Sequence, residues 1–187
     1  MVGLGNPGPD FLSTRHNAGF WFVDRWAGRL GLAFRRSWFR PFSFCTVTNG
    51  GNTLVLAKPL TFMNRSGDVL PALLRRFRAQ TSDLLVVFDQ MDLPPGRVRL
   101  KPHGSSAGHN GLKSLDQAAG SDRYHRLAIG IGRPEGPDVI DHVLGVPTAQ
   151  ETEAIDAALD RAVSLAAQWW SMGWEPLLNA VNQRDPS

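Results

Sequence analysis

Five polar side chains whose types suit the activation of water are spread over the first 110 residues. They are Asn6, His16, Asn64, Asp89 and Asn110. A neutral imidazole, with a pKa near about 6.5, can take a proton from water, and a carboxylate on its other ring nitrogen stabilises the imidazolium that forms. Asparagine amides can donate to a developing oxyanion without adding charge. The set predicts a hydrolytic site, although each asparagine alone could cap a helix or turn, and His16 could be a partly buried imidazole with satisfied hydrogen bonds.

A glycine-rich motif at the start of the chain offers a competing chemistry. Residues 3–8 match G-x-G-x-x-G, which binds dinucleotides when it follows a strand and opens a helix. Only two residues precede the motif here, and Pro7 and Pro9 oppose a helix that starts inside it. The pattern therefore does not favour nucleotide binding.

A second competing motif would make Ser106 a nucleophile. Residues 104–108 match G-x-S-x-G, and an aspartate and His142 follow in the order that serine hydrolases use. The nucleophile of such enzymes follows a buried strand, whereas residues 97–101 alternate basic and apolar side chains. A serine esterase that uses Ser106 is kept as an alternative.

The sequence lacks the ligand patterns of a dedicated metal site. It has no H-E-x-x-H motif and no cluster of cysteine and histidine, so we expect no required metal. The one cysteine, Cys45, lies in an alternating apolar run and is expected to be a reduced structural thiol.

Composition is that of a globular protein with an uneven charge distribution. The chain has 187 residues, 42% hydrophobic and 20% charged, without a long apolar run or a signal-peptide pattern, so we expect a cytoplasmic protein. Residues 1–134 hold 18 basic and 8 acidic residues, a net +10, whereas residues 135–187 hold 2 and 9, a net −7, which together give +3. The basic part favours an anionic partner such as nucleic acid.

Strand and helix patterns alternate along the chain and predict one α/β domain over residues 1–187. Amphipathic spacing predicts helices over residues 17–30 and 69–77, and the T-x-x-E pattern at Thr148 opens a third helix. That third helix is expected to bury Trp169 and Trp170 and to end at Gly173. Strands are expected at 42–48 and 53–57, joined by a hairpin turn, and at 84–88, 97–101 and 126–130. The polar residues lie at the ends of these elements, where α/β sheets build their sites.

Six longer motifs occur in order along the chain. They are VGLGNPG (2–8), TRHNAG (14–19), KPLTFMNRSG (58–67), DLPPG (92–96), GHNGLKS (108–114) and IGIGRP (129–134). Together they resemble the bacterial peptidyl-tRNA hydrolase family, and the match runs from residue 2 to about residue 182.

The resemblance implies a monomeric α/β domain whose mixed, twisted central sheet is flanked by helices. It implies an enzyme that uses water to hydrolyse the ester between a peptide and the 3′ ribose of tRNA, and so recycles tRNA from prematurely released peptidyl-tRNA. The implied partner is peptidyl-tRNA, through its acceptor stem and 3′ end, with no cofactor, membrane or obligate protein partner. A non-catalytic RNA-binding protein on the same fold is the rival reading, and phosphate binding alone would not require the five polar residues together.

The resemblance also assigns roles to residues of this sequence. His16 matches the general base, Asp89 the residue that keeps it basic and oriented, and Asn6 the position that separates peptidyl-tRNA from unblocked aminoacyl-tRNA. The implied contacts to substrate and water are Phe11, Phe62, Met63, Asn64 and Asn110.

The side of the protein expected to bind the tRNA phosphate departs from the family pattern. Lys101 matches a basic residue that meets the tRNA 5′ phosphate, but its usual arginine partner is Ala128 here. Arg126 or Arg133 is the hypothetical replacement.

Overall fold

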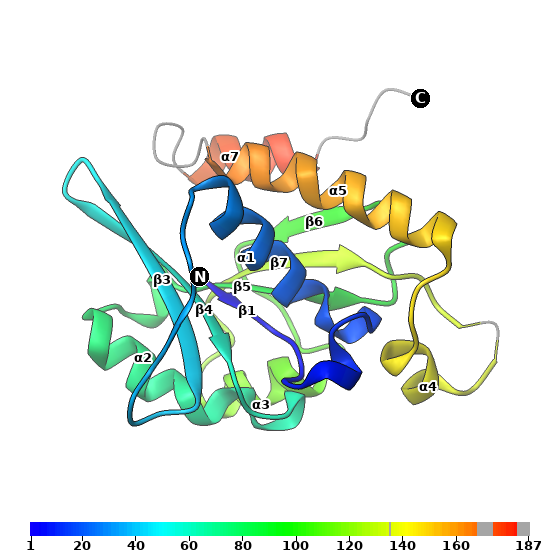
Figure 1. The fold of residues 1–187 in the computed structure, drawn as a ribbon, viewed down its shortest axis with the longest axis horizontal. Coiled ribbons are helices and arrows are strands. Elements are labelled where there is room, and N and C mark those ends of the chain that lie inside the picture. Colours follow the sequence, from blue (N-terminus) through cyan, green and yellow to red (C-terminus); the bar gives the residue numbers. More distant parts are fainter. Residues whose placement is uncertain (135, 168–173, 183–187) are drawn as a thin grey trace.

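Seven strands form one mixed sheet in the computed structural model, which describes residues 1–134, 136–167 and 174–182. The strands lie in the order β2, β3, β4, β1, β5, β7, β6, and β4, β1, β5 and β7 are parallel (Figure 1). The other three strands are antiparallel to their neighbours. The bounds are Val2–Gly3 for β1, Arg35–Arg36 for β2, Phe42–Asn49 for β3, Asn52–Pro59 for β4, Leu85–Gln90 for β5, Val98–Lys101 for β6 and His125–Gly130 for β7. The expected mixed α/β class is confirmed.

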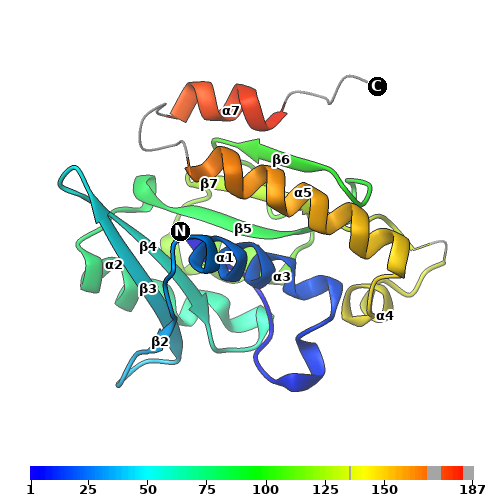
Figure 2. The same cartoon turned by 45° about the horizontal axis from the view of Figure 1, so that its top comes forward.

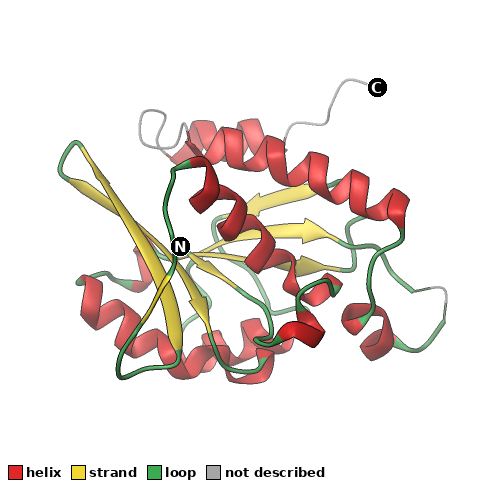
Figure 3. Ribbon diagram, in the orientation of Figure 1, coloured by secondary structure: helices red, strands yellow, loops and turns green. Residues whose placement is uncertain are grey.

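Helices cover both faces of this sheet (Figures 1 and 3). One face packs against α1 (Ala18–Arg29), α5 (Ala149–Ala167) and α7 (Trp174–Asn182), and the other against α2 (Leu70–Phe77) and α3 (Asn110–Ala119). The shorter elements are α4 (Val139–Leu144) and the 3-10 turns Pro9–Phe11, Arg15–Asn17, Met63–Val69 and Thr81–Asp83. None of the described helices is long and apolar enough to span a membrane.

Strand β5 is central because both of its faces are apolar. Leu85 and Val87 join the core under α1 and α5, whereas Val86 and Phe88 join the core over α2 and α3. Successive strand side chains point to opposite faces, so an uninterrupted apolar run is what a strand buried on both sides requires. The run ends at Asp89, which stays at the carboxyl end of β5.

Several local signals in the sequence are confirmed by the structure. Gly50 and Gly51 form the two-residue turn between β3 and β4, and both have the positive φ that such a turn needs. Thr148 and Glu151 exchange the side-chain and backbone bonds of a capping box at α5. Pro71 stands in the first turn of α2, where its missing N–H costs no helical bond. The expected positions of Trp169, Trp170 and Gly173 lie outside the described residues.

The glycine-rich start of the chain serves close packing between α1 and the sheet. A Cβ atom on Gly19 would lie 2.3 Å from the carbonyl oxygen of Val87, and one on Gly3 would lie 2.3 Å from that of Gly19. Helix α1 therefore rests directly on the backbones of β1 and β5. This contact accounts for the glycines without a nucleotide, and it holds the turn before α1, which carries His16, against the end of β5.

Candidate active site

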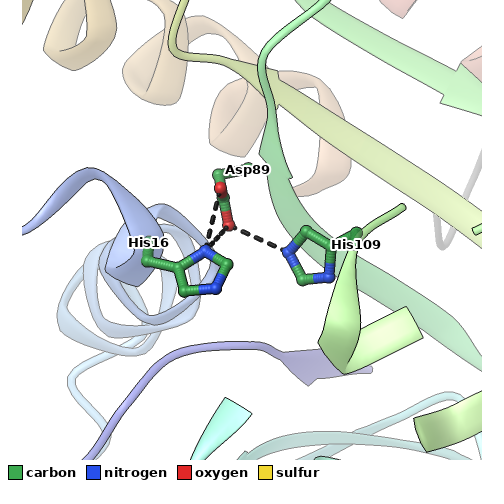
Figure 4. A group of neighbouring side chains, drawn as sticks. All are labelled: His16, Asp89 and His109. Atoms are coloured by element: carbon green, nitrogen blue, oxygen red, sulfur yellow. Dashed lines mark hydrogen bonds and ion pairs between the residues drawn. The ribbon is translucent and has the colours of Figure 1, made fainter. Parts of the chain in front are cut away.

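Two histidines share one buried carboxylate at the carboxyl end of β5. The Nδ1 atom of His16 lies 2.9 and 3.0 Å from the two carboxylate oxygens of Asp89, and Nε2 of His109 lies 3.0 Å from Oδ1 (Figure 4). The Asp89 side chain is only 2% exposed. His16 comes from the turn before α1 and His109 caps the start of α3, so three separate segments meet at this carboxylate.

The hydrogen bonds of both imidazoles fix their tautomers. The backbone N–H of Leu112 donates to Nδ1 of His109 over 3.2 Å, so Nδ1 holds a lone pair and Nε2 carries the proton that Asp89 accepts. His16 donates its Nδ1 proton to Asp89, which leaves a lone pair on Nε2, on the side of the ring away from the carboxylate (Figure 4). The His16, Asp89 and His109 side chains are close enough to hold a metal ion, but both nitrogens that face Asp89 carry protons, an arrangement that opposes coordination there.

The charge of Asp89 tunes His16 as a base. Burial alone would lower the pKa of His16, but the negative charge and hydrogen bonds of Asp89 outweigh it and raise that pKa above its usual value. Burial would likewise raise the pKa of Asp89, but His16 and His109 hold it well below the usual range. Asp89 therefore stays ionised at any pH at which His16 can titrate.

Asn6 is clamped by its neighbours on both its backbone and its side chain. Asn17 accepts the backbone N–H of Asn6 at 2.7 Å and donates to its carbonyl oxygen at 3.0 Å. The backbone N–H of Met63 donates to Oδ1 of Asn6 at 2.8 Å. Because Oδ1 is occupied, the orientation of the amide is fixed, and its Nδ2 protons remain for a ligand.

The remaining expected substrate residues come from three segments, the turn Pro9–Phe11, residues 62–64 and the start of α3. Met63 is buried, and a Cβ atom on Gly111 would lie 2.5 Å from its sulfur, so α3 packs closely on the turn Met63–Val69. Asn64 and Asn110 follow Met63 and His109 directly, and both are exposed. The rings of Phe11 and Phe62 meet edge to face, with centroids 6.2 Å apart.

The structure places Lys101 away from this cluster. Strand β6 is antiparallel to β7, so Lys101 pairs with Arg126 near the start of β7, whereas Asp89 pairs with Ile129 near its end. Lys101 is exposed, and it has no ion pair among the residues that the structure describes. Its expected contact with a tRNA phosphate stays a prediction.

The two proposed replacements for the family arginine at Ala128 differ in their environment. Arg126 is 2% exposed and donates to Asp116 and to the carbonyl oxygen of Ser105, so its guanidinium holds the loop before α3 and is not open to a phosphate. Arg133 is exposed and pairs with Asp92. Of the two, only Arg133 remains accessible.

The environment of Ser106 does not match that of a serine nucleophile. Ser106 lies in the loop between β6, the edge strand, and α3. A nucleophile elbow would follow a strand buried within the sheet, so the context required for a serine esterase is missing.

Two residues of the site were not assigned a role from the sequence. His109 binds Asp89, and Asn17 holds Asn6. The sequence signal that could have pointed to them is the repeated His-Asn pair, which occurs as His16-Asn17 and as His109-Asn110. In each pair only one member had been given a function, whereas the structure uses His109 and Asn17 as supports.

Comparisons with known proteins agree with this geometry. The family model described as "Peptidyl-tRNA hydrolase" matches residues 1–187. A peptidyl-tRNA hydrolase from a Synechococcus strain is 43% identical, covering 100% of this chain and 84% of its own length, and one from Geobacillus kaustophilus is 41% identical over 98% of both. The crystal structure of peptidyl-tRNA hydrolase from Acinetobacter baumannii superposes with a TM-score of 0.93 at 34% identity, covering 100% of this chain and 95% of that one. The chain belongs to the peptidyl-tRNA hydrolase family.

Proposed function

We propose that this protein hydrolyses the ester that joins a peptide to the 3′ ribose of tRNA, through water activated by His16. The observation that carries the proposal is the shared carboxylate: Asp89 accepts hydrogen bonds from His16 and His109, so that the outer nitrogen of His16 is a free base. We further propose that the enzyme acts as a monomer in the cytoplasm, where stalled translation supplies the substrate. The family match and the basic first part of the chain support a tRNA substrate.

In the first step a water molecule bound at Nε2 of His16 attacks the ester carbonyl carbon. Its proton moves to Nε2, and the imidazolium that forms is stabilised by the Asp89 carboxylate on the other side of the ring. The carbonyl oxygen becomes an oxyanion, which accepts from Nδ2 of Asn6 and from the exposed amides of Asn64 and Asn110. No covalent acyl-enzyme forms.

In the second step the tetrahedral intermediate breaks its bond to the ribose 3′ oxygen. That oxygen takes the proton held on Nε2 of His16, which restores the neutral base. The products are the free peptide carboxylic acid and tRNA with a free 3′ hydroxyl. Phe11 and Phe62 offer their edge-to-face pair to the terminal nucleoside.

The test is release of the N-acetylamino acid from an N-acetylated aminoacyl-tRNA, with unacylated aminoacyl-tRNA as a second substrate. Because His16 is the base, His16→Ala should lower kcat/KM by about 10²–10⁴-fold. His103→Ala is the matched control, since His103 is exposed in the loop after β6 and makes no contact with Asp89. The reaction should proceed in EDTA.

Three results would contradict the proposal. If wild type binds tRNA but releases no peptide, the fold is an RNA-binding module. If Ser106 is labelled by a fluorophosphonate and the label blocks turnover, a serine esterase is at work. Loss of activity in EDTA, restored by a divalent metal, would replace His16 with a metal as the activator of water.

A further inference from the structure

The loop that joins β2 to β3 exposes two adjacent aromatic side chains to solvent. Trp38 is 94% exposed and Phe39 is 92% exposed. The other tryptophans that the structure describes, Trp21, Trp26 and Trp174, are buried or half-buried. Neighbouring aromatic rings that face water so completely are a feature of binding surfaces rather than of a folded core.

The backbone of this loop is held in place. The N–H of Ser37 donates to the carbonyl oxygen of Phe42 at 2.9 Å. The N–H of Phe42 donates to the carbonyl oxygen of Arg40 at 2.8 Å. Arg35 stacks on the buried ring of Phe44, with 4.7 Å between guanidinium and ring centroid. The two exposed rings therefore project from a closed turn, which lowers the entropy cost of binding a flat partner.

The charge around the loop has one sign. Residues 25–67 hold seven basic residues and no aspartate or glutamate. Arg36 and Arg40 flank the two rings, and neither has an ion pair among the described parts of the chain. Aromatic rings between unpaired arginines fit single-stranded nucleic acid, whose bases stack on rings and whose phosphates bind guanidinium groups.

The loop lies at the same edge of the sheet as the candidate active site. Phe42 pairs with Pro59 at the carboxyl end of β4, and the N–H of Leu60 donates to the carbonyl oxygen of Pro41 at 2.6 Å. Met63, whose N–H binds Asn6, follows only a few residues later. Figure 2 shows the turn after β2 and the segment after β1 both extending beyond this edge. The loop therefore lies on the same side of the protein as the candidate active site. It is next to β2, at the opposite end of the sheet from β6 and Lys101.

We propose that residues 36–40 form a second RNA-binding element, in which Trp38 and Phe39 stack on unpaired bases and Arg36 and Arg40 bind the phosphates. This rests on the proposed function, because a tRNA whose 3′ ester is at His16 brings unpaired nucleotides to this edge. The protruding rings and the unpaired arginines favour RNA over the peptide part of the substrate, which would need an apolar hollow.

The test compares two double variants on two substrates that carry the same N-acetylaminoacyl ester, one on whole tRNA and one on adenosine. Trp38→Ser/Phe39→Ser should raise KM for the tRNA substrate by about tenfold or more, since each stacked base is lost, and should leave kcat unchanged. Arg36→Gln/Arg40→Gln should lower the salt slope of tRNA binding by about 0.7 for each arginine. Turnover of the adenosine ester should not change in either variant.

Arg75→Gln/Arg78→Gln is the control, because it removes the same charge from two exposed arginines at the end of α2, on one face of the sheet. A KM increase equal to that of Arg36→Gln/Arg40→Gln would show a general charge effect and overturn the proposal. Unchanged KM in the aromatic variant would overturn it too. Equal losses on both substrates would overturn it as well, because the loop would then act on the N-acetylaminoacyl-adenosine part that the two substrates share.

Binding of uncharged tRNA, followed by fluorescence anisotropy, separates this proposal from the proposed function. If wild type hydrolyses neither ester but the loop variants still lose affinity for tRNA, the catalytic proposal fails and the RNA-binding loop stands. If the loop variants lose binding to anionic phospholipid vesicles but keep the tRNA affinity of wild type, the loop meets a membrane surface. That result would overturn the RNA-binding proposal.

Discussion

The candidate active site and the basic surface around it are built in opposite ways. Around Asp89 the polar side chains are buried or half-buried and are bound by residues from other segments, as His109 is by Asp89 and Asn6 by Asn17. On the surface, Lys101, Arg36 and Arg40 are exposed and have no ion pair among the described residues. Activation of water requires fixed geometry, whereas binding of a phosphate backbone requires charge within reach. Substitutions in the first region should therefore act steeply on kcat, and those in the second should act gradually on KM.

The steepest effect is expected from Asp89→Asn. The variant removes the charge that stabilises the His16 imidazolium, so kcat should fall by about 10²–10⁴-fold. Burial, which lowers the pKa of His16, then acts unopposed. In wild type, activity should be lost on acidification through a pKa above about 6.5, and in the variant the acid limb should move below that value. The pH profile of kcat/KM measures this; an acid limb that stays in place would show that Asp89 does not tune His16.

His109→Ala should shift the same limb in the opposite direction, with a smaller loss of kcat. Without the proton donated by His109, the Asp89 carboxylate interacts more strongly with His16, so the pKa of His16 should rise further. Loss of two buried hydrogen bonds should also lower the free energy of unfolding by about 1–3 kcal/mol in urea titrations.

His109→Asn separates the two effects, because asparagine retains an acceptor for the N–H of Leu112 at the start of α3. In His109→Asn the free energy of unfolding should recover, while the upward shift of the acid limb remains. A downward shift of the acid limb in both variants would argue against the hydrogen bond as its cause.

Asn17→Ala has a matched control in Asn182→Ala, at the edge strand β6. Asn182 binds the N–H and carbonyl oxygen of Leu100, both at 2.9 Å, just as Asn17 binds those of Asn6. Either alanine variant loses two bonds of one kind, at about 0.5–1.5 kcal/mol each. Only Asn17→Ala should lower kcat, because it loosens the backbone that carries the Asn6 side chain. Equal kcat values in the two variants would mean that the clamp is merely structural.

Local sequence signals predicted the elements better than the contacts between them. The apolar run ending at Asp89, the glycine turn and the capping box at Thr148 each act within a few residues, so they can be read directly. The His16–Asp89 pair followed from the family motifs. The support from His109 and Asn17 depends on segments brought together by close packing of glycines, which no single window of sequence records.

The accessibility of surface side chains was also hard to predict from local sequence. The sequence made Arg126 a candidate for the tRNA phosphate, but burial beside Asp116 takes it out of contact with solvent. Trp38 shows the reverse, since a tryptophan is expected in the core and here faces water. Which charges and rings a ligand can reach depends on packing, so the RNA-binding surface is less predictable than the catalytic pair.

The smallest effect on catalysis is expected from Lys101→Ala, a change on the basic surface. If Lys101 binds the tRNA 5′ phosphate, the variant should weaken all tRNAs alike and lower the salt slope of binding by about 0.7–0.9, with kcat intact. Arg133→Gln tests whether the accessible arginine also binds a phosphate. Combined with Lys101→Ala, it should lower the salt slope by about a further 0.7–0.9, or one phosphate contact. An unchanged slope in Lys101→Ala would remove Lys101 from the interface. A fall in kcat in the same variant would show that surface charge and catalysis are not separate, since an exposed lysine distant from Asp89 would then be acting on the chemistry.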